Sequence, residues 1–192
     1  MMKYLFLISM FSLLVFSCEK SNVESSSVGL EALPEYAEIT EFEGLPGVSR
    51  ATVKFSNRID EQGEYFDGKR NGSWTVYHAN GLPKTITTYV NGLKQGIHIE
   101  MDTRGELSLV ANYVNGLEDG EYILYNKGKK AESRVYLLGK LNGVKTKYYT
   151  SGKVMEESMY KDGLIHGTAL WYDQNGNVTI QYEYENGKLV QK

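Results

Sequence analysis

The sequence predicts an all-β fold, in which antiparallel β-hairpins repeat along the chain and form one extended single-layer meander sheet. A four-residue motif that begins with Tyr and ends with Gly recurs six times, at steps of 24, 24, 23, 24 and 24 residues. A fixed period of this length is typical of repeat proteins. The segments between the motifs are rich in β-branched and aromatic residues and too short for helices, so we expect strands there. The motifs begin at Tyr65, Tyr89, Tyr113, Tyr136, Tyr160 and Tyr184.

Glycines fall into three sets that keep the same period, and these sets predict where the chain turns. Sixteen of the 20 glycines lie in register, which is far more than chance would place there. Several follow Asn or Asp, and such pairs accept the positive φ angles of a hairpin turn. We therefore expect the glycines of all three sets to form turns, with two strands in each repeat. The sets are Gly68, Gly92, Gly116, Gly139, Gly163 and Gly187; Gly72, Gly96, Gly120, Gly143 and Gly167; and Gly81, Gly105, Gly128, Gly152 and Gly176.

The residue five places after each glycine of the second set is aromatic in four of five repeats. Because side chains alternate across a strand, these residues are expected to share one face and to stack from repeat to repeat. The residues just before them vary more in type and predict a wetter opposite face, on which Trp74 also lies. The first row is Tyr77, Met101, Tyr125, Tyr148 and Tyr172, and the second is Val76, Glu100, Leu124, Lys147 and Trp171.

The N-terminus predicts an exported lipoprotein. Lys3 precedes 13 apolar or small residues at positions 4–16, whereas a helix that spans a bilayer needs about 20. That length is typical of a signal-peptide core, so residues 1–17 are predicted to be a signal peptide. The segment ends in Leu-Val-Phe-Ser-Cys, which resembles the lipobox of bacterial lipoproteins. This resemblance implies that Cys18 carries the lipid anchor, and Glu19 after it favours the outer over the inner membrane of a Gram-negative envelope.

The rest of the chain divides into three parts. Residues 18–33 are polar and Ser-rich without a period, which predicts a flexible tether behind the anchor. Residues 34–64 keep part of the 24-residue spacing, but Val48 and Val53 stand where a glycine and a tyrosine would continue it. We interpret this part as a degenerate capping segment that shields the first strand edge. Residues 65–192 hold the repeats.

The run Tyr-x-Asn-Gly-x-x-x-Gly, followed by an aromatic strand and a second Asn-Gly turn, resembles the bacterial variant of the MORN repeat. The resemblance covers the chain from Tyr65 to about Lys188. It implies a row of β-hairpins that serves as an interaction or membrane-associated scaffold. The same repeat occurs in the family of YwqK-type antitoxins of toxin–antitoxin systems, so it also implies an antitoxin-like role as a further alternative.

Composition argues against several other classes of function. The chain carries 21 Lys and Arg against 24 Asp and Glu, so no basic footprint for nucleic acid is expected. Three histidines lack metal-ligand spacing and are expected at exposed or edge positions, and no phosphate-binding loop or nucleophile elbow is present. Adjacent acids are expected on a solvated face rather than in a walled catalytic cleft. The sequence predicts no enzyme, no metal and no cofactor. The histidines are His78, His98 and His166, and the acids are Glu61, Glu64, Glu118, Asp119, Glu156 and Glu157.

The predicted function is a membrane-anchored module that binds an unknown protein partner. The alternative is a cell-wall or carbohydrate binder, because aromatic rings on a sheet can stack on sugar rings as well as anchor a protein. For Trp74 and Trp171 we expect that alanine abolishes partner capture while thermal stability barely moves. For the tyrosines, mutual packing that holds the sheet is the stronger expectation. The candidate binding residues are Trp74, Tyr77, Tyr122, Tyr125, Tyr148, Trp171 and Tyr172.

Overall fold

A computed structural model describes residues 33–34 and 36–191. The predicted signal peptide, Cys18 and the predicted tether up to residue 32 lie outside the described residues. Within the described part of the chain, no helix is long and apolar enough to cross a membrane.

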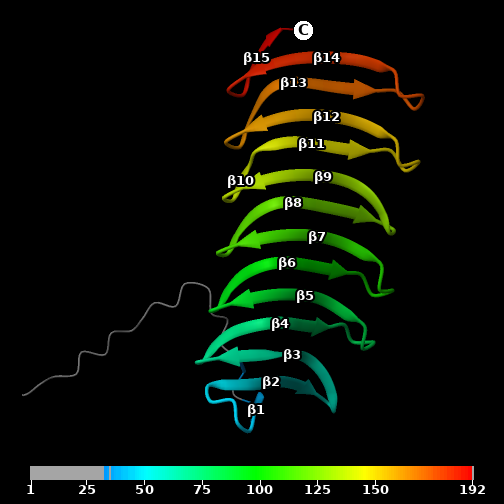
Figure 1. The fold of residues 1–192 in the computed structure, drawn as a ribbon. Coiled ribbons are helices and arrows are strands. Elements are labelled where there is room, and N and C mark those ends of the chain that lie inside the picture. The colour runs from blue at the N-terminus through cyan, green and yellow to red at the C-terminus, as the bar shows by residue number, and fades with distance from the viewer. Residues whose placement is uncertain (1–32, 35, 192) are drawn as a thin grey trace, which may run out of the picture.

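All the regular structure in the described residues belongs to one open antiparallel sheet of 15 strands, so the predicted fold class is confirmed (Figure 1). Each strand pairs with the one that precedes it in the chain, except that β11 pairs with β9 because the short β10 pairs only with β9. The strands are β1 (Glu38–Glu41), β2 (Val48–Phe55), β3 (Arg58–Phe66), β4 (Lys69–Tyr77), β5 (Pro83–Val90), β6 (Leu93–Met101), β7 (Leu107–Val114), β8 (Leu117–Asn126), β9 (Lys129–Leu137), β10 (Lys140–Leu141), β11 (Gly143–Tyr148), β12 (Val154–Lys161), β13 (Leu164–Tyr172), β14 (Val178–Glu185) and β15 (Lys188–Gln191).

The tight turns lie together at one end of the strands, on the left in Figure 1. Asn91 and Gly92 both have positive φ, at 50° and 83°, as a two-residue hairpin turn requires. The Gly92 amide also donates to the carbonyl of Arg70 in the previous repeat at 2.8 Å. This bond recurs in the later repeats, so each turn is tied to its neighbour. The recurring donors are Gly116, Gly139, Gly163 and Gly187.

Longer loops, which contain the third set of glycines, lie at the opposite end of the strands. In two of them an aspartate caps the loop, because Asp102 and Asp173 each accept bonds from backbone amides two and four residues later. Side chains also link one loop to the next. Asn80 donates to the carbonyl of Thr103 at 2.6 Å. The turns at one end of the strands and the loops at the other are therefore both held by contacts between neighbouring repeats, as expected for a linear array.

Four of the five glycines of the second set lie inside strands and the fifth, Gly143, begins β11, so the prediction that these glycines form turns is wrong. In the pairing of β5 with β6, Thr87 faces His98 but Tyr89 faces Lys94, which leaves extra residues on β6 around Gly96. Gly96 has a φ of 82°, which a β-bulge accommodates with glycine. The period thus marks two kinds of positive-φ site, one at the turns and one at the bulges.

The pairing register divides the sheet into two faces, which we call the Trp74 face and the Tyr77 face after a residue on each. Val76 pairs with Thr85, and Thr85 with Glu100, and this rung continues across the sheet to Trp171. The prediction that the residues of this row share one face of the sheet is confirmed. The Trp74 face is not the wetter one, however, because most buried side chains lie on it. They include Ala51, Val53, Arg70, Trp74, Thr87, His98, Leu109, Ala111, Ser158 and Ala169.

The row that contains Tyr77 does not form the predicted stack. The ring contacts found among the described residues all lie on the Trp74 face. The hydroxyl groups of Tyr77, Tyr148 and Tyr172 bond instead to polar residues 15 positions earlier. Tyr77 accepts from Gln62 at 2.6 Å, and Tyr172 donates to Glu157 at 3.0 Å. Cross-strand hydrogen bonds therefore replace ring stacking, since neighbouring members of the row stand two strands apart.

The predicted capping segment 34–64 continues the sheet. It forms β1, β2 and most of β3, so the predicted boundary at residue 64 falls inside a strand. β1 is only four residues long and ends the sheet on this side. Short, charged strands are a usual way to blunt an edge, and Glu38 on β1 is ion-paired with Lys54 at 2.7 Å.

Candidate functional site

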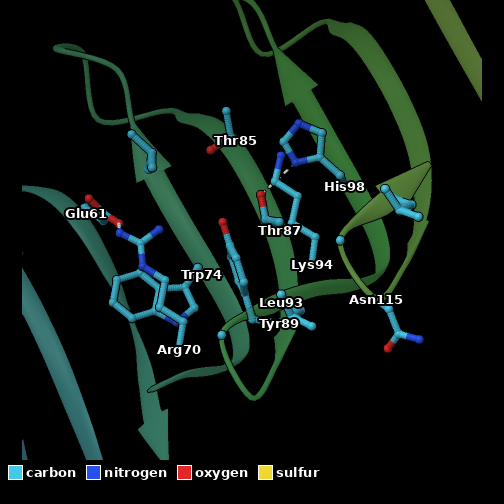
Figure 2. A pocket seen from close by; sticks show the side chains of 14 residues that line it. Glu61, Arg70, Trp74, Thr85, Thr87, Tyr89, Leu93, Lys94, His98 and Asn115 are labelled. Carbon is cyan, nitrogen blue, oxygen red and sulfur yellow. Dashed lines mark hydrogen bonds and ion pairs between the residues drawn. The ribbon is translucent and has the colours of Figure 1, made fainter. Parts of the chain in front are cut away.

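A hollow of about 620 Å³ opens on the Trp74 face above β4, β5 and β6, and we call it the Tyr89 groove (Figure 2). It exists because the side chains that β5 contributes here, Thr85 and Thr87, are smaller than those that flank them on β4 and β6. The pairing places Thr87 between Trp74 on β4 and His98 on β6. Tyr89 stands in the middle of the groove in Figure 2, with the turn of the next repeat at its rim.

One wall of the groove is formed by Arg70, Trp74 and Glu61. The Arg70 guanidinium carbon lies 4.3 Å from the centre of the Trp74 ring, and its Nη2 is 2.9 Å from Oε1 of Glu61. Arg70 is only 7% exposed. Burial lowers the pKa of Arg70, but the carboxylate of Glu61 and the hydroxyl of Tyr89 outweigh it, so the pKa is raised. This wall is a fixed, charge-balanced stack.

The other wall is formed by His98 and Lys94. His98 is buried and lies in the middle of the sheet, so the expected exposed or edge position is wrong for this histidine. Its Nδ1 is 2.7 Å from Oγ1 of Thr87, and its Nε2 is 3.1 Å from Oε1 of Glu100. The Lys94 ammonium lies 4.8 Å from the centre of the Tyr113 ring and forms no ion pair with any described residue.

Tyr113, behind Lys94, predicts a specific pH dependence of stability. Burial, and then the charge of Glu118, raise the pKa of Tyr113 to about 12. An unfolded tyrosine titrates near 10, so between these values the folded protein binds more protons than the unfolded one. Stability from this group is complete below about pH 10 and is lost as the pH rises through 12. Urea midpoints between pH 9 and 12 should fall less steeply in Tyr113→Phe than in the native chain, and parallel curves would contradict this.

The seven candidate binding residues do not form one patch. Trp74, Tyr122 and Trp171 lie on the Trp74 face, and the other four lie on the Tyr77 face. Trp74 is only 2% exposed and packs edge-on against Tyr65. Tyr122 and Trp171 are half-buried and contact the rings of Tyr136 and Tyr182. Only Trp74 lines the groove. The four on the Tyr77 face are Tyr77, Tyr125, Tyr148 and Tyr172.

The sequence interpretation missed the residues that face Trp74 across the groove. A signal for them was present in the repeats, at the position two residues before each glycine of the second set. This position changes from cationic to acidic to apolar along the chain. Its occupants are Arg70, Lys94, Glu118, Leu141 and Ile165.

The acidic pairs do not form a catalytic arrangement. Glu156 lies on the Trp74 face, where it binds Lys147 at 2.9 Å, and Glu157 lies on the other face beside Tyr172. Neighbours in a strand point to opposite faces, so two adjacent carboxylates cannot act on one substrate atom. In the part of the chain that the structure describes, no group of three His, Cys, Asp or Glu residues could hold a metal ion.

Two segments of the array resemble a known repeat family. Residues 141–162 and 165–186 match the MORN repeat variant. These segments start 24 residues apart, and each covers a loop-linked strand pair up to the next tight turn. They confirm the resemblance for this part of the chain. No curated protein matches the chain, and the antitoxin-like role stays a prediction.

Proposed function

We propose that the chain is a membrane-anchored lipoprotein of the cell envelope whose repeat sheet binds a protein partner without catalysing a reaction. The observation that supports a partner is a band of exposed apolar side chains on the Tyr77 face. It runs from β5 to β13 beside the tight turns, and every member is more than a third exposed. The apolar band consists of Val90, Leu93, Ile97, Val114, Leu117, Val135, Leu137, Val144, Met159 and Leu164.

The apolar band is larger than the fold itself needs. Leu117 on β8 lies close to the next turn, because a Cβ added at Gly139 would come within van der Waals distance of its side chain. It is nevertheless 49% exposed, as Met159 on β12 is 48% exposed. Contiguous apolar surface of this kind is typical of protein interaction sites. A partner that covered the band would supply the second layer that a single sheet lacks.

Capture of the partner tests the role of the band. The full lipoprotein would be crosslinked in its native envelope and purified with whatever it holds. Leu117→Lys and Val144→Lys each place a charge at an exposed position in the apolar band. Each substitution should abolish capture of the partner. Ile180→Lys is the matched control, because Ile180 is 44% exposed but lies on the Trp74 face. Unchanged capture by the first two variants, or equal loss in all three, would argue against this surface.

The membrane anchor rests on the lipobox-like sequence before Cys18 and is tested separately. Cells would be grown with a clickable fatty acid, and the chain would be isolated from the membrane and soluble fractions. We expect label on the native chain in the outer membrane fraction, and neither label nor membrane association in Cys18→Ser. Two or three acyl chains hold a protein durably. A mature N-terminus without acyl chains would refute the anchor but not the scaffold.

A further inference from the structure

The Tyr89 groove lies where the repeat departs from its own pattern. Lys94 occupies the position that Leu141 and Ile165 occupy in later repeats, and all three stand opposite a motif tyrosine on the Trp74 face. Since an apolar residue fills this place in the later repeats, the fold does not require a cation there. Burying part of a lysine without a carboxylate partner has a cost. The positive charge beside the groove is therefore a feature to be explained by function.

Two cationic side chains line the groove, Arg70 and Lys94, and the charge of Lys94 is the one that a ligand could neutralise. Glu61 offsets the charge of Arg70 at 2.9 Å, and that pair is fixed against the Trp74 ring. Lys94 forms no ion pair within the described residues and reaches only the face of Tyr113. The groove is suited to one negative group on its Lys94 side.

The remaining lining is suited to a polyhydroxyl ring. Tyr89 is half-buried and projects between the two walls (Figure 2). The Arg70 guanidinium carbon lies over this ring, 5.6 Å from its centre, and the rest of the ring is a flat apolar surface with a hydroxyl at its tip. Thr85 supplies a hydroxyl, which both donates and accepts hydrogen bonds. A volume of about 620 Å³ lies in the range of small-ligand sites and has room for one or two sugar rings.

An acidic peptide suits the groove less well. Extended peptides are held mainly by backbone hydrogen bonds to a free sheet edge. The groove lies on the face of the sheet over β4 to β6, and each of these strands pairs with a neighbour on both sides. A peptide carboxylate would find Lys94 but no backbone partners.

We propose that the Tyr89 groove binds a pyranose that carries a carboxylate, such as a uronic acid unit of an acidic glycan. The sugar ring lies against Tyr89, its carboxylate meets Lys94, and one of its hydroxyls bonds to Thr85. The groove opens on the Trp74 face, and two members of the apolar band, Leu93 and Leu117, also line its rim. The observations that support the groove as a sugar site are nevertheless separate from those that support the protein partner.

Calorimetric titration of the full chain in detergent tests the proposal. The probes are a galacturonate disaccharide, the neutral galactose disaccharide, a glutamate dipeptide and inorganic phosphate. We expect the acidic disaccharide alone to bind and Lys94→Gln to weaken it at least tenfold, with affinity restored in Lys94→Arg. Lys161→Gln, which removes an exposed lysine beside another tight turn, should bind as the native chain does.

Tryptophan emission locates the bound sugar. The chain has only two tryptophans, so in Trp171→Phe the emission reports on Trp74 in the groove wall. The acidic disaccharide should shift this emission, and Tyr89→Leu should remove both the shift and the heat. Circular dichroism confirms that each variant is folded. No binding at millimolar disaccharide, equal binding of the neutral sugar, dipeptide or phosphate, or unchanged binding in Lys94→Gln would overturn the proposal.

Discussion

Trp74→Ala is expected to destabilise the protein by about 3–5 kcal/mol, the usual loss for a large buried aromatic side chain. The indole is only 2% exposed, its N–H donates to the carbonyl of Glu64 at 2.9 Å, and Arg70 covers its outer face. The substitution leaves a cavity, a Glu64 carbonyl that has lost its indole donor, and a guanidinium without its stacking partner. Each of these losses adds to the cost. This burial replaces our sequence-based expectation that stability would barely move.

Urea unfolding followed by circular dichroism measures this loss, and Trp171→Ala is its control. Trp171 is half-buried and its one ring contact is Tyr182 at 5.5 Å, so we expect less than half of the destabilisation. Because a linear array can unfold from one end, the Trp74 variant should also lose its N-terminal strands first. Equal effects of the two substitutions would show that burial on this face does not control stability.

The period of the sequence was sufficient to predict the strand pairs and their faces. Residues at equal places in successive repeats fall on the same rung, and alternation along the strand then assigns the face, as it did for Val76 and Trp171. Glycine spacing was less informative. Gly92 in a turn and Gly96 in a bulge both have positive φ, so the pattern alone cannot distinguish these sites.

Which face is buried could not be predicted, because a single layer has no inside that a hydrophobic pattern would mark. Burial in this sheet depends on pairs of residues that are distant in the sequence. Trp74 is covered because Gly63 beneath it has no side chain, and the groove is open because Thr87 is small. Comparing the repeats position by position would have found Lys94, since no later repeat has a positive charge at this position.

Gly63→Ala is expected to destabilise the protein by about 1–3 kcal/mol through overpacking. Gly63 lies in the middle of β3 under the indole of Trp74, and an added Cβ would overlap the ring atoms Cδ2 and Cε2. Glycine is not needed for the backbone here, because its φ is not positive. Two periods after Gly63, Ala111 occupies the equivalent place opposite Tyr122, so the position itself accepts a methyl group. The requirement for glycine comes from the size of Trp74.

A double-mutant cycle separates this clash from a general preference for glycine. In Gly63→Ala combined with Trp74→Leu, the smaller side chain makes room for the new methyl group. The double variant should therefore lose less stability than the two single variants together, by about 1 kcal/mol or more. Ala111→Gly combined with Trp74→Leu should show no such coupling, because Ala111 lies two repeats away. Additive losses at Gly63 would mean that the indole does not rest on this glycine, and the buried wall of the groove would then need another explanation.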